Sequence, residues 1–174
     1  MRHITGFTFI ESLIIIAIVG LTLAIGIPSL SRILEQSRLH SATSSLVRSL
    51  QMARSVALMQ ENYTCVSKIG DSWQSGWRVF IDPNLNCVLD PGETTLLEHG
   101  AISLTVRIKA TKTAGSHVLF APSGESVLLN GGFQAGSIYV CASDQLTAGY
   151  RIVVKRGGAL RAESAPANEP KCTS

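Results

Sequence analysis

The sequence lacks the short motifs by which many enzymes are identified. No serine stands in a G-x-S-x-G nucleophile elbow, and Gly131-Gly132 lacks the lysine and helix that complete a phosphate-binding loop. None of the four cysteines belongs to a Cys-x-x-Cys pair, which argues against a zinc ribbon or a thioredoxin-type redox site. We therefore expect a protein that is not an enzyme and has no organic cofactor.

Strong net charge and low-complexity segments are also missing. The chain has 15 Lys and Arg against 12 Asp and Glu, and its formal net charge is +3. A balance this close to neutral does not by itself indicate a nucleic-acid-binding protein. The 174 residues suffice for an N-terminal segment and one small domain with its own core.

The N-terminus carries a long apolar run behind a short polar leader. Residues 1–6 (MRHITG) include Arg2, and Phe7 to Ile27 is apolar except for Glu11 and a few small or hydroxyl residues. As a helix rising about 1.5 Å per residue, this run approaches the thickness of a bilayer. The basic leader predicts a cytoplasmic N-terminus, with the rest of the chain across the membrane.

Glu11 is unusual in such a segment. A carboxylate in a membrane helix costs about 2.5–3.5 kcal/mol on insertion scales, so such residues are usually paired and functional. A free α-amino group at Phe7 would lie one helical turn from Glu11, and an amine could equally come from a neighbouring subunit. The alternative is a glutamate close enough to the interface to stay hydrated.

The segment Gly6-Phe7-Thr8-Phe9-Ile10-Glu11, followed by the apolar run, resembles the class III signal of type IV pilins and type II secretion pseudopilins. The resemblance implies that a prepilin peptidase cuts between Gly6 and Phe7 and N-methylates Phe7. It also implies that Glu11 is a determinant of subunit assembly. Phe9 and Ser12 stand where the family commonly has leucine.

Past Pro28 the apolar residues recur at three- and four-residue steps, which predicts an amphipathic helix to about residue 60. These residues are Leu30, Ile33, Leu34, Leu39, Thr43, Leu46, Leu50, Ala53 and Ala57. We expect a leader at 1–6, a transmembrane or filament-core half of the helix at 7–28, an amphipathic half at 29–61 and a β-rich domain at 62–174.

Short β-type runs separated by Gly-, Asp- and Ser-rich turns follow the helix. They are Tyr63–Ile69, Gly76–Ile81, Thr94–Leu97, Ile102–Lys109, His117–Phe120, Ser126–Leu129, Ser137–Ala142 and Tyr150–Val154. The predicted fold is α+β, a long N-terminal helix packed on an antiparallel β-sandwich-like domain. Trp73 and Trp77 flank a turn, and we interpret them as packing residues or, alternatively, as a partner surface.

An even number of cysteines behind an export segment predicts two disulfides in an oxidising compartment. Three connectivities are open, and we favour pairing of chain neighbours, Cys65 with Cys87 and Cys141 with Cys172. Four buried free thiols are the alternative. A bond from Cys172 would hold down the otherwise loose tail SAPANEPKCTS.

Several longer stretches resemble the GspH/FimT group of pilin-like proteins. They are LQMARSVALMQENYT, GWRVFIDPNLNCVLDPGE, FAPSGE, SIYVCAS and YRIVVKRGGALR. The resemblance implies a minor pilin that primes or caps a type IV pilus and supports twitching motility and adhesion. The two-disulfide pattern suggests a FimU-like minor pilin, and an H-type pseudopilin of type II secretion is the alternative.

The same resemblance implies partners and a location. The partners are prepilin peptidase, other minor pilins and the major pilin, the pilins being contacted through the N-terminal helices. The chain would cross the inner membrane once, with its β domain in the periplasm, and then enter the pilus or pseudopilus near the tip.

One loop has the ligand spacing of a calcium site. Asp82, Asn84, Asn86, Asp90 and Glu93 occupy positions 1, 3, 5, 9 and 12 of a twelve-residue EF-hand loop. Cys87 stands at the sixth position, where glycine is usual, and the residues on both sides of the loop are predicted to form strands. The alternative is a polar hairpin loop rich in turn formers.

A basic cluster near the C-terminus suggests a second ligand, DNA. Some relatives in the group that bind DNA carry Gly-Arg-x-Arg, whereas this chain has Gly158-Ala159-Leu160-Arg161. Lys155, Arg156 and Arg161 are the candidate phosphate contacts of a DNA-uptake subunit. Ordinary charges on a solvated strand edge are the alternative.

Overall fold

The structure, a computed structural model, describes residues 9–144 and 147–173, and gives only the backbone of 25–28 and 173. The chain divides into two compact units, Met1–Leu34 and Glu35–Ser174. Gly6 and Phe7, the expected cleavage and methylation positions, lie outside the described residues.

Helix α1 runs from Phe9 to Gln60, which confirms the long N-terminal helix predicted from the sequence. In the second unit its buried residues follow the predicted three- and four-residue steps: Leu39, Ala42, Thr43, Leu46, Ser49, Leu50, Ala53 and Ala57. The helix ends where Glu61 takes a left-handed φ of 49°, and the Asn62 N–H donates back to the Ala57 carbonyl. This is the geometry of a common helix C-cap, here without the usual glycine.

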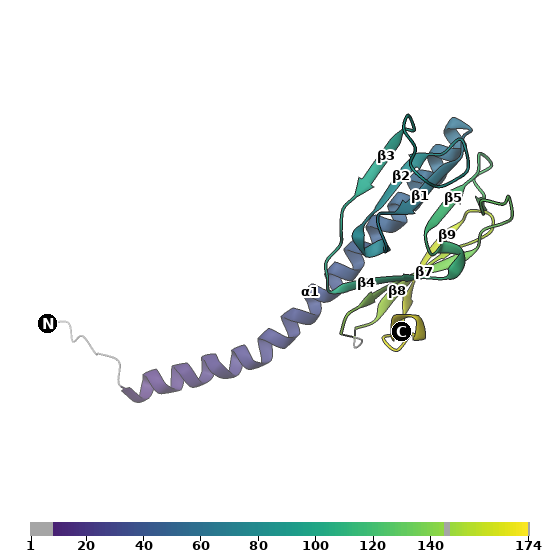
Figure 1. Cartoon of the computed structure of the whole chain (residues 1–174). Helices are drawn as coiled ribbons and strands as arrows, with labels where there is room; N and C mark the ends of the chain where they lie inside the picture. Colours follow the sequence, from purple (N-terminus) through teal and green to yellow (C-terminus); the bar gives the residue numbers. More distant parts are fainter. Residues whose placement is uncertain (1–8, 145–146, 174) are drawn as a thin grey trace. The chain divides into compact units, whose positions relative to one another are not determined.

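Among the described residues of the second unit, nine strands form two antiparallel sheets (Figure 1). The five-stranded sheet has the order β3-β2-β1-β5-β6, from Thr95–His99, Trp77–Ile81, Thr64–Lys68, His117–Phe120 and Ser126–Val127. The four-stranded sheet has the order β4-β7-β8-β9, from Val106–Ala110, Gly136–Ala142, Gly149–Val154 and Leu160–Ala165. Short 3₁₀ helices, η1 at Trp73–Ser75 and η2 at Lys112–Ala114, lie between strands.

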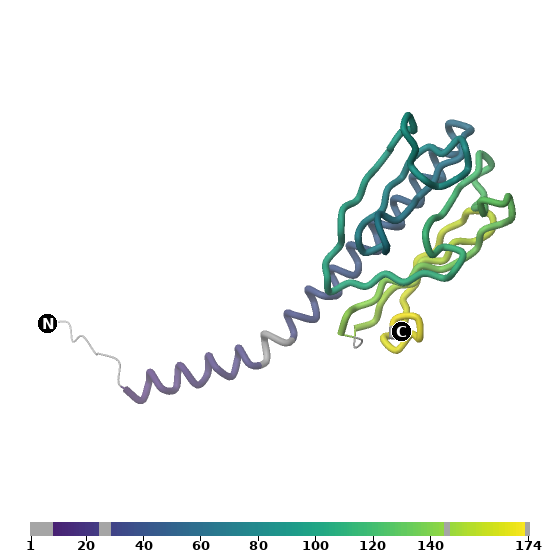
Figure 2. Tube along the Cα trace, viewed as in Figure 1, coloured from purple at the N-terminus to yellow at the C-terminus, as the bar shows by residue number. Residues whose placement is uncertain are grey.

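Both sheets and the second part of α1 contribute to one apolar core. Fully buried Leu46 and Leu50 of the helix share it with Val66 of the five-stranded sheet and with Ile138 and Ile152 of the four-stranded sheet. Each such side chain stabilises the fold by about 1.5–3 kcal/mol when fully buried. The chain passes between the two sheets in the segments from β3 to β4, from β4 to β5 and from β6 to β7. The tube in Figure 2 traces this path.

The structure differs from the sequence prediction in the C-terminal third. Leu160–Ala165, which is not among the predicted strands, forms β9 and pairs with β8 along its whole length. Half of its residues are polar and half are exposed, as suits an edge strand, so the apolar signal of a buried strand is absent. The tail ends in a short helix, α2 at Pro170–Thr173, and β4 begins at Val106 rather than at Ile102.

Trp73 and Trp77 are packing residues. Trp73 is 2% exposed and Trp77 is fully buried. Their indole N–H groups donate to the Ala114 carbonyl and to Ser49 Oγ, respectively. Because both rings face the interior of the domain, neither contributes a partner surface.

Candidate functional site

The first unit presents an apolar helix surface that carries Glu11 in its first turn. Side chains there are exposed in the isolated chain, for example Phe9 at 81%, Ile16 at 68% and Leu21 at 65%. By length and composition, α1 is able to cross a membrane. Glu11 is itself exposed among these apolar neighbours.

Two disulfides join neighbouring cysteines along the chain. Cys65 of β1 bonds Cys87, and Cys141 of β7 bonds Cys172 of α2, both with a Cα–Cα distance of 5.6 Å. The second bond fixes the C-terminal helix to the four-stranded sheet. The tail is therefore not a loose end.

The loop between β2 and β3 brings the five candidate calcium ligands together. The buried Asp82 carboxylate accepts from the backbone N–H of Cys87 at 2.8 Å and of Asn86 at 3.3 Å. The side-chain amides of Asn84 and Asn86 both donate to Asp90 Oδ2 at 2.8 Å, and they lower the pKa of the Asp90 carboxyl. Glu93 Oε2 accepts from the Asp90 N–H at 3.0 Å.

This loop is not an EF-hand, because strands β2 and β3 flank it instead of helices. Cys87, at the position usually held by glycine, adopts the left-handed φ of 52°, and Leu85 has a φ of 64°. Several of the expected ligand oxygens already accept hydrogen bonds from the loop itself. Cys65, Asp82 and Cys87 also gather their ligand atoms within 4.8 Å, but both sulfurs are in the disulfide and offer no thiolate.

The C-terminal basic residues are spread along one hairpin and are partly neutralised. Lys155 and Arg156 lie at the β8–β9 turn, where the Arg156 guanidinium stacks 4.2 Å from the Phe133 ring centroid. Arg161 of β9 pairs with Glu163 at 3.5 Å, and Arg151 of β8 pairs with the same carboxylate at 3.5 Å. The candidate DNA contacts with no acidic partner among the described residues are therefore the two at the turn.

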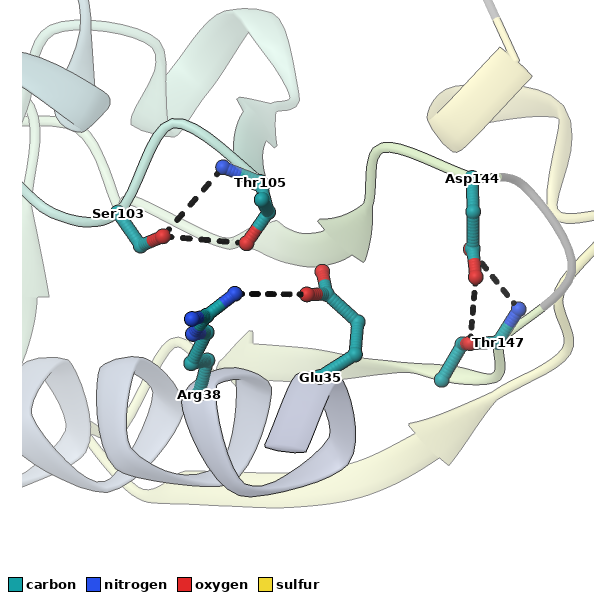
Figure 3. Close-up of polar contacts among 6 residues, drawn as sticks. All are labelled: Glu35, Arg38, Ser103, Thr105, Asp144 and Thr147. Carbon is teal, nitrogen blue, oxygen red and sulfur yellow. Dashed lines mark hydrogen bonds and ion pairs between the residues drawn. The ribbon is translucent and has the colours of Figure 1, made fainter. Parts of the chain in front are cut away.

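Figure 3 shows polar pairs that the sequence did not single out. Arg38 Nη1 lies 3.7 Å from Glu35 Oε2 on α1, in an i,i+3 pair worth about 0.2–0.5 kcal/mol. Ser103 Oγ contacts Thr105, and Asp144 accepts from Thr147 through both the N–H and the hydroxyl. These contacts order two connecting loops and contain no reactive nucleophile–base pair.

The β domain also has two concave surfaces that no sequence motif indicates. One groove of about 390 Å³ runs between α1 and the edge strand β9, with His40, Val47, Tyr150 and Glu163 among its lining residues. A pocket of about 460 Å³ lies on the five-stranded sheet, around Arg78 and His117. No sequence signal predicts either, because each depends on which strands lie next to each other.

Comparison with known proteins agrees with this architecture. A family model described as "Type II transport protein GspH" matches residues 42–158, more than half of the chain. No curated protein sequence matches the chain.

Solved structures with a similar fold include two minor pilin-like proteins. The crystal structure of the type IV minor pilin FimU from Pseudomonas aeruginosa PAO1 is 23% identical, with a TM-score of 0.60, and the match covers 78% of this chain and 93% of that one. The minor pseudopilin EpsH from the type 2 secretion system of Vibrio cholerae is 11% identical, with a TM-score of 0.51 and coverage of 74% and 96%. At these identities the likeness concerns the fold.

Proposed function

The chain belongs to the GspH family of type II transport proteins, and from this premise we propose that it is a minor pilin, a structural subunit that primes or caps a type IV pilus. In this role it supports twitching motility and adhesion by starting or terminating the filament. The fold shared with FimU supports a place in a pilus, and the fold shared with EpsH supports the alternative, a type II secretion pseudopilus. Both roles are structural, not catalytic.

The observation that carries the proposal is the exposed apolar surface of the first unit. An 18-residue window of α1 is apolar enough for a membrane and none of it is buried within the chain. Such a surface is stable only in lipid or against other apolar helices. A subunit that leaves the membrane to enter a helical filament exchanges lipid for the apolar helices of neighbouring subunits.

Glu11 sets the height at which the subunit docks against its neighbours in the filament. Cleavage between Gly6 and Phe7 frees an α-amino group, which is then N-methylated. A carboxylate in an apolar surrounding is costly unless it is paired, so docking that brings the amine to Glu11 is favoured over docking at other heights. The amine comes from the same chain or from a neighbouring subunit.

The proposed location follows from the same chemistry. Before assembly the chain crosses the inner membrane once, with its β domain in the periplasm, where disulfides persist. After processing by prepilin peptidase it joins other minor pilins and the major pilin through the N-terminal helices, near the filament tip.

The decisive experiment deletes the gene and measures sheared surface pili, protein secretion and DNA uptake in parallel. We expect pili to be lost and to return with the wild-type gene, but not with Gly6→Val, which blocks processing, or with Glu11→Ala. Ser12→Ala is the matched control, because it alters the next residue of the same helix and keeps the carboxylate. Normal pilus entry by Glu11→Ala would refute the assembly mechanism.

Other results of the same deletion would place the protein in a different system. Normal pili with failed secretion indicate the pseudopilin role, and normal pili with failed transformation indicate DNA uptake. The exposed Lys155 and Arg156 at the β8–β9 turn favour DNA as the second candidate function. In that case a low-salt gel shift of the full chain is lost with Lys155→Ala/Arg156→Ala and kept with Lys112→Ala, an exposed cation on η2.

A further inference from the structure

The pocket on the five-stranded sheet lies on the face turned away from the shared core. Val66, Val79 and Val118 point into the core. Side chains alternate along a strand, so the neighbouring Ser67, Arg78 and His117 point to the opposite face. The registers Ser67↔Arg78 and Ser67↔His117 place these three side chains in one row across β2, β1 and β5.

The row forms the floor of a walled pocket. The loop that carries the Cys65–Cys87 disulfide bounds it with Cys87, Val88 and Leu89, and Leu129 contributes to its lining from the segment after β6. The next row along the same strands is apolar, with Phe80, Cys65 and Leu119 fully buried. The pocket measures about 460 Å³, within the range of roughly 300–1,000 Å³ typical of ligand sites.

Arg78 gives this floor an unsatisfied donor. Its Nε is buried and has no hydrogen-bond partner among the described residues. A buried donor without an acceptor destabilises the folded chain. The guanidinium keeps its charge at every physiological pH and matches a carboxylate in bidentate geometry.

The other charged groups around Arg78 do not neutralise its guanidinium, so the pocket can accept one negative charge. Lys68 Nζ donates to the Asp71 backbone carbonyl, and both oxygens of buried Asp82 accept backbone N–H groups. Glu98 stands opposite Arg78 on β3, but it is exposed, and the described residues include no ion pair between the two. Burial lowers the pKa of His117 and favours its neutral form, which contributes hydrogen bonding without further charge.

Two aliphatic side chains lie exposed on the rim of the pocket, beside the exposed polar residues Asn86 and Ser116. Val88 is 58% exposed and Leu129 is 46% exposed. A phosphate polymer would require a run of cations around the site, whereas this pocket is lined by two cations, Arg78 and Lys68, together with aliphatic side chains. An acidic residue between aliphatic residues has the complementary pattern.

We propose that this pocket binds a glutamate or aspartate flanked by aliphatic residues on an extended segment of a partner protein, with the carboxylate on Arg78 and the aliphatic side chains on Val88 and Leu129. This binding site is separate from the N-terminal helix and does not depend on the proposed assembly role. It would add a contact made by the β domain alone.

The test uses the full-length ¹⁵N-labelled chain in detergent micelles, titrated with acetyl-Leu-Glu-Val-amide and followed by NMR chemical shifts. We expect saturable shifts at the Arg78 side-chain Nε–H and at the amides of Ser67, Cys87 and His117. The isosteric peptide acetyl-Leu-Gln-Val-amide, sodium acetate and inorganic phosphate should each bind at least tenfold more weakly.

Variants separate the pocket from general attraction between charges. Arg78→Gln should abolish saturable binding, and Val88→Asp, on an exposed rim position, should weaken it at least tenfold without affecting the fold. Arg107→Gln is the matched control, because Arg107 is also a strand arginine with a buried Nε that no described residue accepts from. Equal binding of the Glu and Gln peptides, equal binding of phosphate, or unchanged binding by Val88→Asp would each overturn the proposal.

Discussion

Trp77 of β2 donates its indole N–H to Ser49 Oγ of α1 at 2.9 Å, inside the core of the β domain. Trp77 is fully buried, and Ser49 is 4% exposed. The His99 ring stacks on Trp77 at a centroid distance of 4.1 Å. The hydrogen bond from Trp77 to Ser49 fixes the rotation of α1 relative to the five-stranded sheet. The buried indole N–H needs an acceptor, and Ser49 meets it at one rotation of the helix.

Ser49→Ala should therefore destabilise the domain more than loss of a hydroxyl on the surface. The variant leaves the Trp77 N–H buried without its acceptor, at a cost of about 1–3 kcal/mol in free energy of unfolding. Urea unfolding followed by tryptophan fluorescence measures this, with Ser45→Ala, one turn earlier and partly exposed, as the control. A loss equal to that of the control would show that the contact contributes no stability.

Gly158 should not tolerate a side chain, whereas its neighbour should. Gly158 has a φ of +71°, and a Cβ there would lie 1.9 Å from the Gly124 carbonyl oxygen. Arg54 holds the same turns together through the carbonyls of Gly124 and Gly157. We expect Gly158→Ala to lower the free energy of unfolding by more than about 1 kcal/mol. Gly157→Ala, with open space around its Cβ, should be within about 0.5 kcal/mol of wild type.

Removal of the Cys141–Cys172 disulfide should release the C-terminal helix. The bond closes 31 residues, and its loss in Cys141→Ala/Cys172→Ala should cost about 2–4 kcal/mol. Hydrogen exchange should accelerate first at α2, which contacts β7 and β4. In Cys65→Ala/Cys87→Ala the acceleration should instead fall on the loop between β2 and β3. Unchanged exchange at α2 in the first variant would contradict the anchoring role.

His117 should make the domain less stable in mild acid. Burial is the main cause that lowers the pKa of His117 below 6.5, and the Asp82 charge opposes it only in part. The unfolded state then binds protons more readily, so this stability is complete above the unfolded pKa of about 6.5 and is lost as the pH falls from there through the folded pKa. His117→Gln should flatten the pH dependence of the free energy of unfolding below about pH 6.5, measured by urea unfolding at a series of pH values.

Calcium binding by the loop from Asp82 to Glu93 is open to a direct test. If the loop takes the ion, millimolar calcium should release heat in calorimetry and raise Tm, because binding stabilises only the folded chain. Asp90→Asn should lose both effects, and magnesium should not reproduce them. Absence of heat and of a thermal shift in the wild-type chain would exclude the site.

Much of the fold could be predicted because its signals are local. Helix α1 follows from the step between Leu39, Leu46 and Leu50, and eight of the nine strands follow from short apolar runs bounded by turn residues. Strand β9 could not be predicted from alternation, since an edge strand with three of its six residues exposed has little apolar pattern. Its pairing partner β8, not its own composition, makes Leu160–Ala165 a strand.

Some features of the candidate site are also visible in the sequence, and others arise only in the folded structure. The Gly6–Glu11 segment is contiguous, so its resemblance to a prepilin signal is visible in the sequence, and the spacing of Asp82 to Glu93 is visible for the same reason. The pairing of Arg161 and Arg151 with one Glu163 weakens the basic cluster, and it arises only when β8 and β9 lie side by side. A count of charges along the sequence does not show which of them pair with a charge on a neighbouring strand.

The sequence by itself determined the membrane-length helix, the acid within it, the even set of cysteines and the alternation of the strands, because each depends on residues close together in the chain. Only the tertiary structure decided that Ser67, Arg78 and His117 form one row beneath a disulfide-bonded loop, and that Trp77 meets Ser49. Strand order and register create such neighbours across long separations. Burial then determines whether their donors, acceptors and charges are satisfied within the chain or remain for a partner.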